Sequence, residues 1–368
     1  MAIIDVSNNL EDFRVKINVS DNSMTLIIDH YSGKAETVTV PAFLGKIPVT
    51  TIGSYSFLLE EKIKQITISE GIVSIEQSAI TSCEKLVSII LPKSLTSIGD
   101  GAFNDCPMLT NIKLPENLVS IGYEAFENCE SLTSIHLPKN LVKLGEGVFS
   151  GCNNLTEITV AKKNPAFKAV DGVLFTKNMN TLLFYPGGRK GDYIVPDSVF
   201  EIHPGAFHNC KELTRITLPE ELISLKGEIF IGCEKLLNIT VQGQNSFFSG
   251  IKGVLVNKEK KFLIRYPKGR RNKNYIVPDT VLTIGHGAFY ECKFLKNIVL
   301  PENLVLIGDE TFSGCEGLNT ITFPNKLKFI GERAFENCPN LKTITLSKKT
   351  KLGCRALDGF SGKLIYKN

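Results

Sequence analysis

The chain has 368 residues, of which 43% are hydrophobic and 22% charged, and its formal net charge is +4. So mild a charge balance does not indicate a nucleic-acid partner. No apolar run approaches the roughly 18 residues of a membrane-spanning helix, so the sequence predicts no transmembrane segment. The stretch from Met1 to Phe13 lacks the basic and apolar regions of a secretory signal. This leaves open both a protein that stays inside the cell and one whose leader has been removed.

The first 45 residues precede the regular part of the chain. Apolar residues alternate with polar ones from Phe13 to Val19 and from Met24 to Ile28, a pattern typical of half-buried β-strands. We therefore expect an N-terminal β cap over residues 1–45.

A repeat of 23 residues occupies the chain from residue 46 to residue 346. Its consensus is L-x-x-I-x-L-P-x-x-L-x-x-I-G-x-x-A-F-x-x-C-x-x, and the segment from Leu109 to Cys129 is a clean copy. A fixed period of this length indicates one small structural unit, copied so that each copy buries its apolar side chains against its neighbours. The cysteines that keep the spacing are Cys83, Cys106, Cys129, Cys152, Cys210, Cys233, Cys292, Cys315 and Cys338.

Each part of the consensus predicts an element of one coil. The alternation in L-x-x-I-x-L predicts a short strand with Ile and the last Leu buried, and the following Pro, which has no N–H to donate, ends that strand. The Gly after the second Ile suits a tight corner or a positive φ, and A-F-x-x-C predicts a helical turn with Phe and Cys pointing inward. Strands of successive coils are expected about 4.8 Å apart in one long parallel sheet.

Two longer coils interrupt the repeat. The cysteine spacing increases after Cys152 and again after Cys233, and both intervals contain G-V-L-(F/V), then Y-P, then Y-I-V-P. Alternating apolar residues around two polar stretches predict β-hairpin insertions near 161–195 and 242–277. The predicted fold class is therefore an α/β-type right-handed stack of coils, a solenoid, with a long parallel β-sheet, short helical turns and two β-hairpin insertions.

The regular pattern decays towards the end of the sequence. A degenerate copy, Leu352-Gly353 followed by Leu357, falls after residue 346. Terminal repeats are usually atypical because one of their faces meets water. We expect residues 347–368 to form a degenerate repeat and a C-terminal cap.

The regular cysteines allow two interpretations. Neighbouring coils would bring their Cα atoms close enough for disulfides, as in an oxidised secreted scaffold. However, Cys occupies an inward position of the repeat, where it buries well as a small apolar side chain, and this favours reduced, buried thiols. Cys354 lies out of phase and is expected to be the accessible one.

The exposed side of the predicted sheet is the first candidate for a binding surface. It is formed by the x positions of L-x-x-I-x-L, which hold mainly small hydroxyl and amide side chains. Either threonine simply favours strands there, or the face is a broad, weakly charged platform that hydrogen-bonds an extended protein or glycan, with low affinity because aromatic anchors are few. The candidate contact residues are Thr110, Asn111, Lys113, Thr133, His136, Thr156, Glu157, Thr159, Thr214, Arg215 and Thr217.

The second candidate is a run of basic residues in and after the second insertion. It is either an ordinary solvated loop or a site for sulfated glycans or acidic protein, held by salt-sensitive contacts. Its members are Lys258, Lys260, Lys261, Arg265, Lys268, Arg270, Arg271 and Lys273.

Motifs that would indicate catalysis or a metal centre are missing from the sequence. There is no H-E-x-x-H, no G-x-x-x-x-G-K-[ST] and no C-x-x-C, and the five histidines are scattered. We therefore expect no catalytic residue, no bound metal and no cofactor.

The repeat resembles the BspA-like class of leucine-rich repeats, the 23-residue type that carries I-G-x-x-A-F-x-x-C. The likeness covers roughly residues 40–346 and includes the units with G-V-L-(F/V) and Y-P. It implies a leucine-rich repeat solenoid that is surface-exposed or secreted, from a mucosal bacterium or a parasitic protozoan. The resemblance further implies adhesion to host matrix proteins such as fibronectin, and a role in virulence.

Together, the repeat class and the missing catalytic motifs predict a non-catalytic protein-binding solenoid. The leading hypothesis is a cell-surface adhesin that binds a host extracellular-matrix protein on the sheet face, assisted by the basic hairpin. The alternative is an intracellular or secreted scaffold or effector that uses the same sheet for protein–protein interaction, because no signal peptide is visible in the sequence and a cytoplasmic location is left open.

Overall fold

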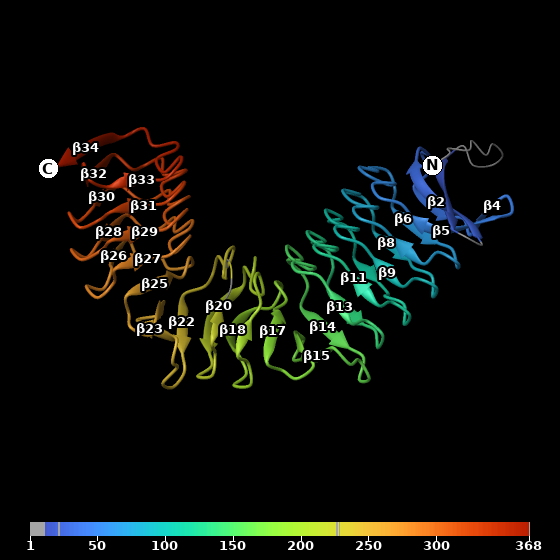
Figure 1. Cartoon of the computed structure of the whole chain (residues 1–368), viewed down its shortest axis with the longest axis horizontal. Coiled ribbons are helices and arrows are strands. Elements are labelled where there is room, and N and C mark those ends of the chain that lie inside the picture. Colours follow the sequence, from blue (N-terminus) through green and yellow to red (C-terminus); the bar gives the residue numbers. More distant parts are fainter. Residues whose placement is uncertain (1–11, 21–22, 226, 228, 368) are drawn as a thin grey trace. The chain divides into compact units, whose positions relative to one another are not determined.

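The computed structural model describes residues 12–20, 23–225, 227 and 229–367. Residues 1–11 of the predicted N-terminal cap lie outside the described residues. The chain divides into two compact units: unit 1 is Met1–Arg189 with Ile202–Cys210, and unit 2 is Lys190–Glu201 with Lys211–Asn368. Each unit is built from short strands joined by turns (Figure 1), and no helix occurs within the described residues.

The strands of unit 1 form two parallel ladders. The first ladder comes from L-x-x-I-x-L and contains β3, β6, β8, β10, β12 and β14; the second comes from the L-x-x-I-G part and contains β5, β7, β9, β11 and β13. The bounds in unit 1 are β1 (Phe13–Ser20), β2 (Ser23–Tyr31), β3 (Thr37–Val40), β4 (Phe43–Leu44), β5 (Ile47–Ile52), β6 (Gln65–Ile68), β7 (Ser74–Ile75), β8 (Ser88–Ile90), β9 (Ser97–Ile98), β10 (Asn111–Ile112), β11 (Ser120–Ile121), β12 (Ser134–Leu137), β13 (Lys143–Leu144), β14 (Glu157–Val160), β15 (Phe167–Val170), β16 (Val173–Thr176) and β17 (Thr181–Phe184).

Unit 2 repeats the same arrangement. Its first ladder contains β18, β20 and β22 and then β26, β28, β30, β32 and β34, and its second ladder contains β25, β27, β29, β31 and β33. The bounds are β18 (Gly191–Ile194), β19 (Glu201–Ile202, where the two units' segments meet), β20 (Leu213–Leu218), β21 (Ser224–Leu225), β22 (Asn238–Val241), β23 (Phe248–Ile251), β24 (Val254–Asn257), β25 (Phe262–Arg265), β26 (Asn274–Ile276), β27 (Thr283–Ile284), β28 (Asn297–Val299), β29 (Leu306–Ile307), β30 (Thr320–Thr322), β31 (Phe329–Ile330), β32 (Thr343–Ser347), β33 (Lys351–Leu352) and β34 (Lys363–Lys367).

The prediction of one long sheet is wrong in two respects. Each regular coil contributes a second strand of only two residues, such as Ser97–Ile98, which the sequence did not predict. The first ladder is also divided into hydrogen-bonded segments, because β10 ends one four-stranded sheet of unit 1 and β12 begins a separate pair with β14. The parallel pairing itself is confirmed, and it joins equivalent residues of successive coils, as in Ile135↔Ile158.

The predicted core is confirmed in both units. The inward Ile, Phe and Cys side chains are buried, and Phe103 and Phe126 of unit 1 are completely excluded from solvent. Their rings stack with centroids 5.2 Å apart, and Phe289 and Phe312 of unit 2 stack at the same distance. Because a buried apolar side chain contributes roughly 1.5–3 kcal/mol, the in-phase packing of several per coil is what stabilises the stack.

The predicted helical turn at A-F-x-x-C is wrong, and backbone hydrogen bonding explains why. In unit 1 the amide of Phe103 donates to Ala125 O (2.8 Å) and that of Phe126 donates to Val148 O (2.9 Å), so these groups bond the following coil instead of their own turn. The flanking Glu124 has a φ of 52°, in the left-handed region that a right-handed helix does not contain. The segment is a chain of tight turns whose backbone continues the coil-to-coil pairing.

The glycine of I-G is required by close approach rather than by an unusual φ. A Cβ atom on Gly122 would lie 2.5 Å from Asp100 N and 2.6 Å from Gly99 C, both backbone atoms of the preceding coil. The φ of Gly122 is not in the left-handed region, so the alternative of a positive φ at this position is wrong. The positive φ values fall two residues later, at Glu124 in this coil.

The insertions consist of antiparallel strands. In unit 1, β15 pairs with β16 and β16 with β17, and in unit 2, β23 pairs with β24 and β24 with β25. An arginine packs against each insertion. In unit 2, Arg270 lies over the Tyr266 ring at 5.4 Å and donates a hydrogen bond to Lys252 O. In unit 1, Arg189 lies over the Tyr185 ring at 5.8 Å. The division into caps and solenoid at residues 45 and 346 stays a prediction.

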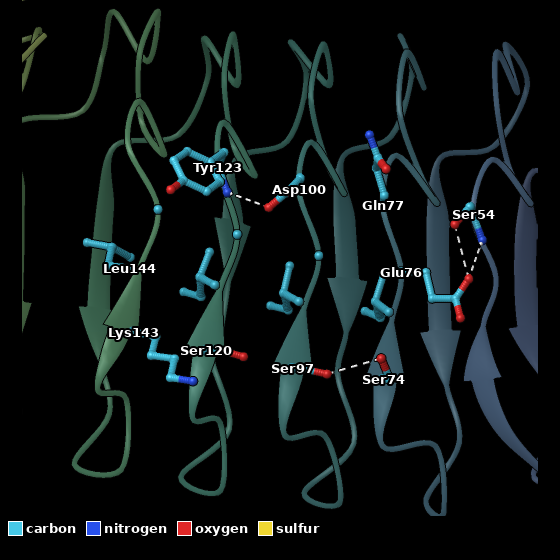
Figure 2. A pocket seen from close by; sticks show the side chains of 16 residues that line it. Ser54, Ser74, Glu76, Gln77, Ser97, Asp100, Ser120, Tyr123, Lys143 and Leu144 are labelled. Carbon is cyan, nitrogen blue, oxygen red and sulfur yellow. Dashed lines mark hydrogen bonds between the residues drawn. The ribbon is translucent and has the colours of Figure 1, made fainter. Parts of the chain in front are cut away.

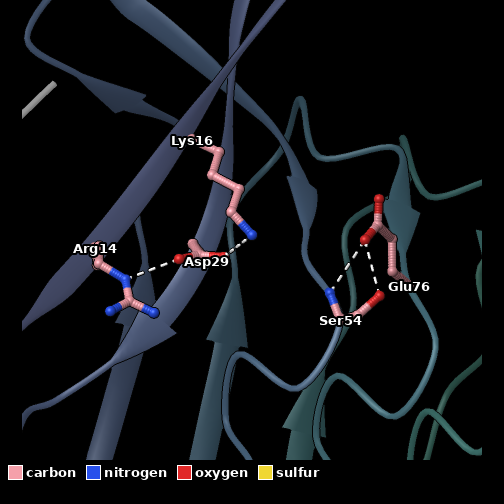
Figure 3. A network of polar contacts seen from close by, with 5 residues as sticks. All are labelled: Arg14, Lys16, Asp29, Ser54 and Glu76. Atoms are coloured by element: carbon pink, nitrogen blue, oxygen red, sulfur yellow. Dashed lines mark hydrogen bonds and ion pairs between the residues drawn. The ribbon is translucent and has the colours of Figure 1, made fainter. Parts of the chain in front are cut away.

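The first described strands carry a network of charged side chains (Figure 3). Asp29 on β2 pairs with Arg14 Nε at 2.7 Å and with Lys16, both on β1. Partial burial acts to raise the pKa of Asp29, but the hydrogen bonds and charges of Lys16 and Arg14 outweigh it and hold that pKa below its ordinary value. The ion pairs therefore join the antiparallel pair that precedes the repeats.

Replacing Gly122 with alanine should destabilise the fold. The new Cβ would force two coils apart, and overpacking of this kind costs typically 1–3 kcal/mol. Gly187→Ala is the matched control, because its Cβ would meet only ordinary contacts, the nearest being Asn209 O at 3.4 Å, without a left-handed φ. Denaturant unfolding of both variants measures the difference, and an equal loss of stability would contradict the close-approach explanation.

Candidate functional site

The structure places the predicted sheet face of unit 1 at the surface. Residues from β10, β12 and β14 and from the positions next to them are exposed, while Ile112, Ile135 and Ile158 of the same strands are buried. The exposed members in unit 1 are Thr110, Asn111, Lys113, Thr133, His136, Thr156, Glu157 and Thr159. The structure therefore brings these eight residues onto one face.

Hydrogen bonds between coils fix the hydroxyl groups of this face. Thr110 Oγ1 donates to Val87 O and Thr156 Oγ1 donates to Thr133 O, each at 3.3 Å. His136 Nδ1 lies 2.9 Å from Thr159 Oγ1. A hydroxyl that donates its proton keeps two lone pairs, so the threonines present ordered acceptors to solvent.

The three predicted residues of unit 2 lie on β20. Arg215 is exposed, and Thr214 and Thr217 are partly exposed. Asp192 on β18 accepts from Thr214 Oγ1 and pairs with Arg215 at 3.2 Å, and these contacts hold the pKa of Asp192 below its ordinary value, chiefly through the Thr214 hydrogen bond. Arg215 thus already has a carboxylate partner.

The predicted basic hairpin does not form one charged surface. Arg265 is buried and donates to Gly287 O, Lys268 pairs with Glu291 and is 15% exposed, and Arg270 is held by Tyr266 and the Leu237 and Lys252 carbonyls. Arg265 therefore cannot be part of a polyanion site. Among the remaining members, Lys260, Lys261, Arg271 and Lys273 are exposed and Lys258 is partly exposed.

A groove along the second ladder of unit 1 was not predicted (Figure 2). It has a volume of about 610 Å³. Serine hydroxyls repeat along it in register, since Ser74 pairs with Ser97 and Ser97 with Ser120, and Ser97 Oγ lies 3.0 Å from Ser74 Oγ. Lys143 continues the row. The recurring letters S-I-G are the signal that could have revealed this ladder.

Carboxylates on the groove are engaged by neighbouring coils. Glu76 Oε2 accepts from Ser54 N at 3.1 Å and from Ser54 Oγ at 3.0 Å, and Asp100 Oδ1 accepts from Tyr123 N at 2.8 Å (Figures 2 and 3). The residues that line the described groove include no His or Cys that would activate a serine hydroxyl. The groove can hydrogen-bond a ligand through its serine hydroxyls, and its lining also contains Lys143, which pairs in register with Ser120.

The regular cysteines are buried and none of them forms a disulfide within the described residues, in line with the prediction of reduced thiols, and Cys354 is exposed. Several of their thiols donate to backbone carbonyls of the preceding coil, as Cys129 Sγ does to Phe103 O at 3.2 Å. Burial raises the pKa of Cys152 and of Cys292 to about 12. Since the thiolate is the reactive form, these cysteines are structural.

Metal ligands do not gather in the described part of the chain. No group of three or more His, Cys, Asp or Glu side chains there is arranged to hold a metal ion. Over the same residues, the structure contains no helix with the length and apolar character to cross a membrane.

The coils and their two ladders define a repeat solenoid, and comparison with known proteins identifies its family. The BspA type leucine-rich repeat region matches residues 50–180, 177–250 and 268–362. The chain therefore belongs to the BspA-type leucine-rich repeat family, and its fold is a leucine-rich repeat solenoid. No curated protein matches the chain.

Solved structures share the fold. A leucine-rich cell surface protein of Faecalibacterium prausnitzii is 24% identical, with a TM-score of 0.58 over 100% of this chain and 95% of its own. The pneumococcal vaccine antigen PcpA is 21% identical, with a TM-score of 0.58 over 100% of this chain and 99% of its own. A leucine-rich repeat protein of Eubacterium ventriosum is 22% identical, with a TM-score of 0.54 over 89% and 94%.

Thiol labelling should distinguish Cys354 from the regular cysteines. In the native protein at mildly alkaline pH we expect Ellman's reagent to label Cys354 quickly, because it is exposed, and the nine buried thiols only after unfolding. Cys354→Ser should abolish the fast phase. Fast labelling of further thiols in the native protein would contradict the buried arrangement.

Proposed function

We propose that the chain is a non-catalytic protein-binding solenoid displayed at a cell surface, where it holds a host extracellular-matrix protein such as fibronectin. Membership of a family whose solenoids are typically protein-interaction scaffolds supports the protein-binding part. The cell-surface description of the Faecalibacterium protein supports the proposed location. The observation that carries the proposal is the first ladder of unit 1, where eight hydroxyl-, amide- and charge-bearing residues share one exposed face.

The chemistry of this face suits an extended polypeptide. The threonine hydroxyls of successive coils are held by carbonyls of the neighbouring coil, so little side-chain entropy is lost when a partner binds. Their free lone pairs accept hydrogen bonds from a partner's backbone N–H groups. None of its eight members is an aromatic anchor of the kind that dominates many interfaces. Each contact with a partner would therefore contribute little affinity, and tight binding would need a large interface area.

The exposed lysines of the hairpin would assist on unit 2. Lys260, Lys261 and Lys273 are open to solvent and would attract acidic protein or a sulfated glycan at low salt. An intracellular or secreted scaffold would use the same faces with a different partner, so the identity of the bound protein separates the two functions.

Immobilised fibronectin tests the proposal by biolayer interferometry. The wild-type protein should bind saturably at low salt, and the double variant Thr110→Arg, Thr133→Arg should weaken binding about tenfold or more, because two long cations would cover the hydrogen-bonding face. The matched control, Asn117→Arg with Asn140→Arg, adds the same charges to the same two coils outside the face and should bind like the wild type.

Two outcomes would contradict the proposal. Absence of saturable binding to fibronectin, fibrinogen or other matrix proteins would remove adhesion as the function. Equal effects of the two double variants would mean that any binding seen does not use the first ladder of unit 1.

A further inference from the structure

The second ladder of unit 2 carries an apolar row at the position that is hydroxyl-rich in unit 1. Strands β25, β27, β29, β31 and β33 follow one another in this ladder (Figure 1). Their outward residues pair in register as Phe262, Thr283, Leu306, Phe329 and Lys351. The corresponding row of unit 1 is Ser74, Ser97, Ser120 and Lys143.

The row of unit 2 is exposed although the repeat does not require it to be apolar. Phe262 is 38% exposed, and Leu306 and Phe329 are each 37% exposed, whereas the inward Ile284, Ile307 and Ile330 are fully buried. The serines at the same position in unit 1 show that this site accepts a hydroxyl without loss of the fold. Three large apolar side chains aligned on one exposed face are typical of an interaction surface.

A small pocket adjoins the Phe262 end of the row. It has a volume of about 180 Å³, and Leu225, Phe230, Phe262 and Ile264 are among its lining residues. A pocket bordered by aromatic and aliphatic groups accepts an apolar side chain, as at the centre of many protein interfaces. The row therefore offers an exposed apolar surface, here called the track, and a pocket at one end that can hold an apolar side chain of a partner.

Lysines stand at both ends of this track. Lys261 precedes Phe262, and Lys328 and Lys351 lie next to Phe329, with Lys351 N donating to Lys328 O at 2.9 Å. All three are exposed, and none forms an ion pair with a described residue. On the side beyond the glycines, Asp309 accepts from Glu332 N at 2.7 Å, and Glu332 lies 3.7 Å from Arg333. The apolar row therefore has exposed lysines at both ends, while the carboxylates of Asp309 and Glu332 lie beyond the glycines.

We infer that this row binds an extended segment of a partner protein that has apolar side chains in its middle and carboxylates at both ends. The inference deepens the proposed protein-binding function by naming the chemistry of a partner segment, and it concerns unit 2 alone. Four steps of about 4.8 Å separate β25 from β33, so the lysine-bearing ends lie roughly 19 Å apart. An extended chain rises about 3.3 Å per residue, so about six residues span that distance.

Fluorescence polarisation with a defined peptide tests the inference. The probe is a fluorescein-labelled peptide with a pair of glutamates at each end and alternating leucine and serine between them. Two further peptides serve as controls, one with lysines in place of the glutamates and one with serines in place of the leucines. We expect the first peptide to bind and both controls to bind at least about tenfold more weakly, since each lacks one of the two complementary features.

The repeats of unit 1 supply matched variants. Leu306→Ser with Phe329→Ser installs the hydroxyls found at the same position in Ser97 and Ser120, and it should weaken peptide binding about tenfold or more. Lys328→Thr installs the residue type of Thr96 and should weaken binding and flatten its salt dependence. Ile276→Ser removes a 69% exposed apolar side chain from the first ladder of unit 2 and should leave binding unchanged.

Clear results would overturn the inference. Failure of the wild-type protein to bind the acidic-apolar peptide would do so, as would binding that the Leu306→Ser, Phe329→Ser variant retains in full. Heparin that binds as tightly as the peptide, with sensitivity to Lys328→Thr only, would indicate a polyanion site instead. Because fibronectin binding is tested on unit 1, a negative result there leaves the peptide experiment interpretable.

Discussion

Backbone hydrogen bonding from each coil to the next is the constraint on which the structure depends. The strands pair in both ladders, and even the turns bond forward, as Phe126 N does to Val148 O. Buried polar backbone groups must be paired, and for the strands and for the Phe amides of the turns the partner lies in the neighbouring coil. The coils therefore lie so close that Gly122 has no room for a Cβ, and the inward Phe and Cys side chains follow in phase.

Because of this constraint, the residues that stabilise the fold and the residues available to bind a partner occupy different positions of the repeat. Inward positions must keep the repeat, whereas outward positions of the same strands are free to vary because they contact only their counterparts one coil away. The second ladder shows the result: Ser97 and Ser120 in unit 1 correspond to Leu306 and Phe329 in unit 2. One backbone thus presents a hydrogen-bonding row in one unit and an apolar row in the other, and two different binding chemistries become possible without a change of fold.

The sequence repeat predicts which side chains are buried, but it does not predict features that depend on contacts between coils. The burial of Phe126 and Cys129 follows from spacing alone, and it is confirmed. The second ladder was missed because a two-residue strand such as Ser97–Ile98 carries no alternation. The prediction of a helical turn was wrong because A-F-x-x-C has helical spacing, while its Phe amide bonds the following coil. Arg265 and Arg270 read as surface charges because their partners, Gly287 O and the Tyr266 ring, are set by tertiary packing.

Amide hydrogen exchange tests the coil-to-coil bonding most directly, because each turn amide reports its own hydrogen bond. If the turns bond forward, Phe103 and Phe126 should be protected as strongly as strand amides such as Ile135, and the loop amides of Glu116 and Asn117 should exchange quickly. Turn amides that exchange at the rate of Glu116 and Asn117 would contradict the account, because only strand pairing and side-chain packing would then join the coils.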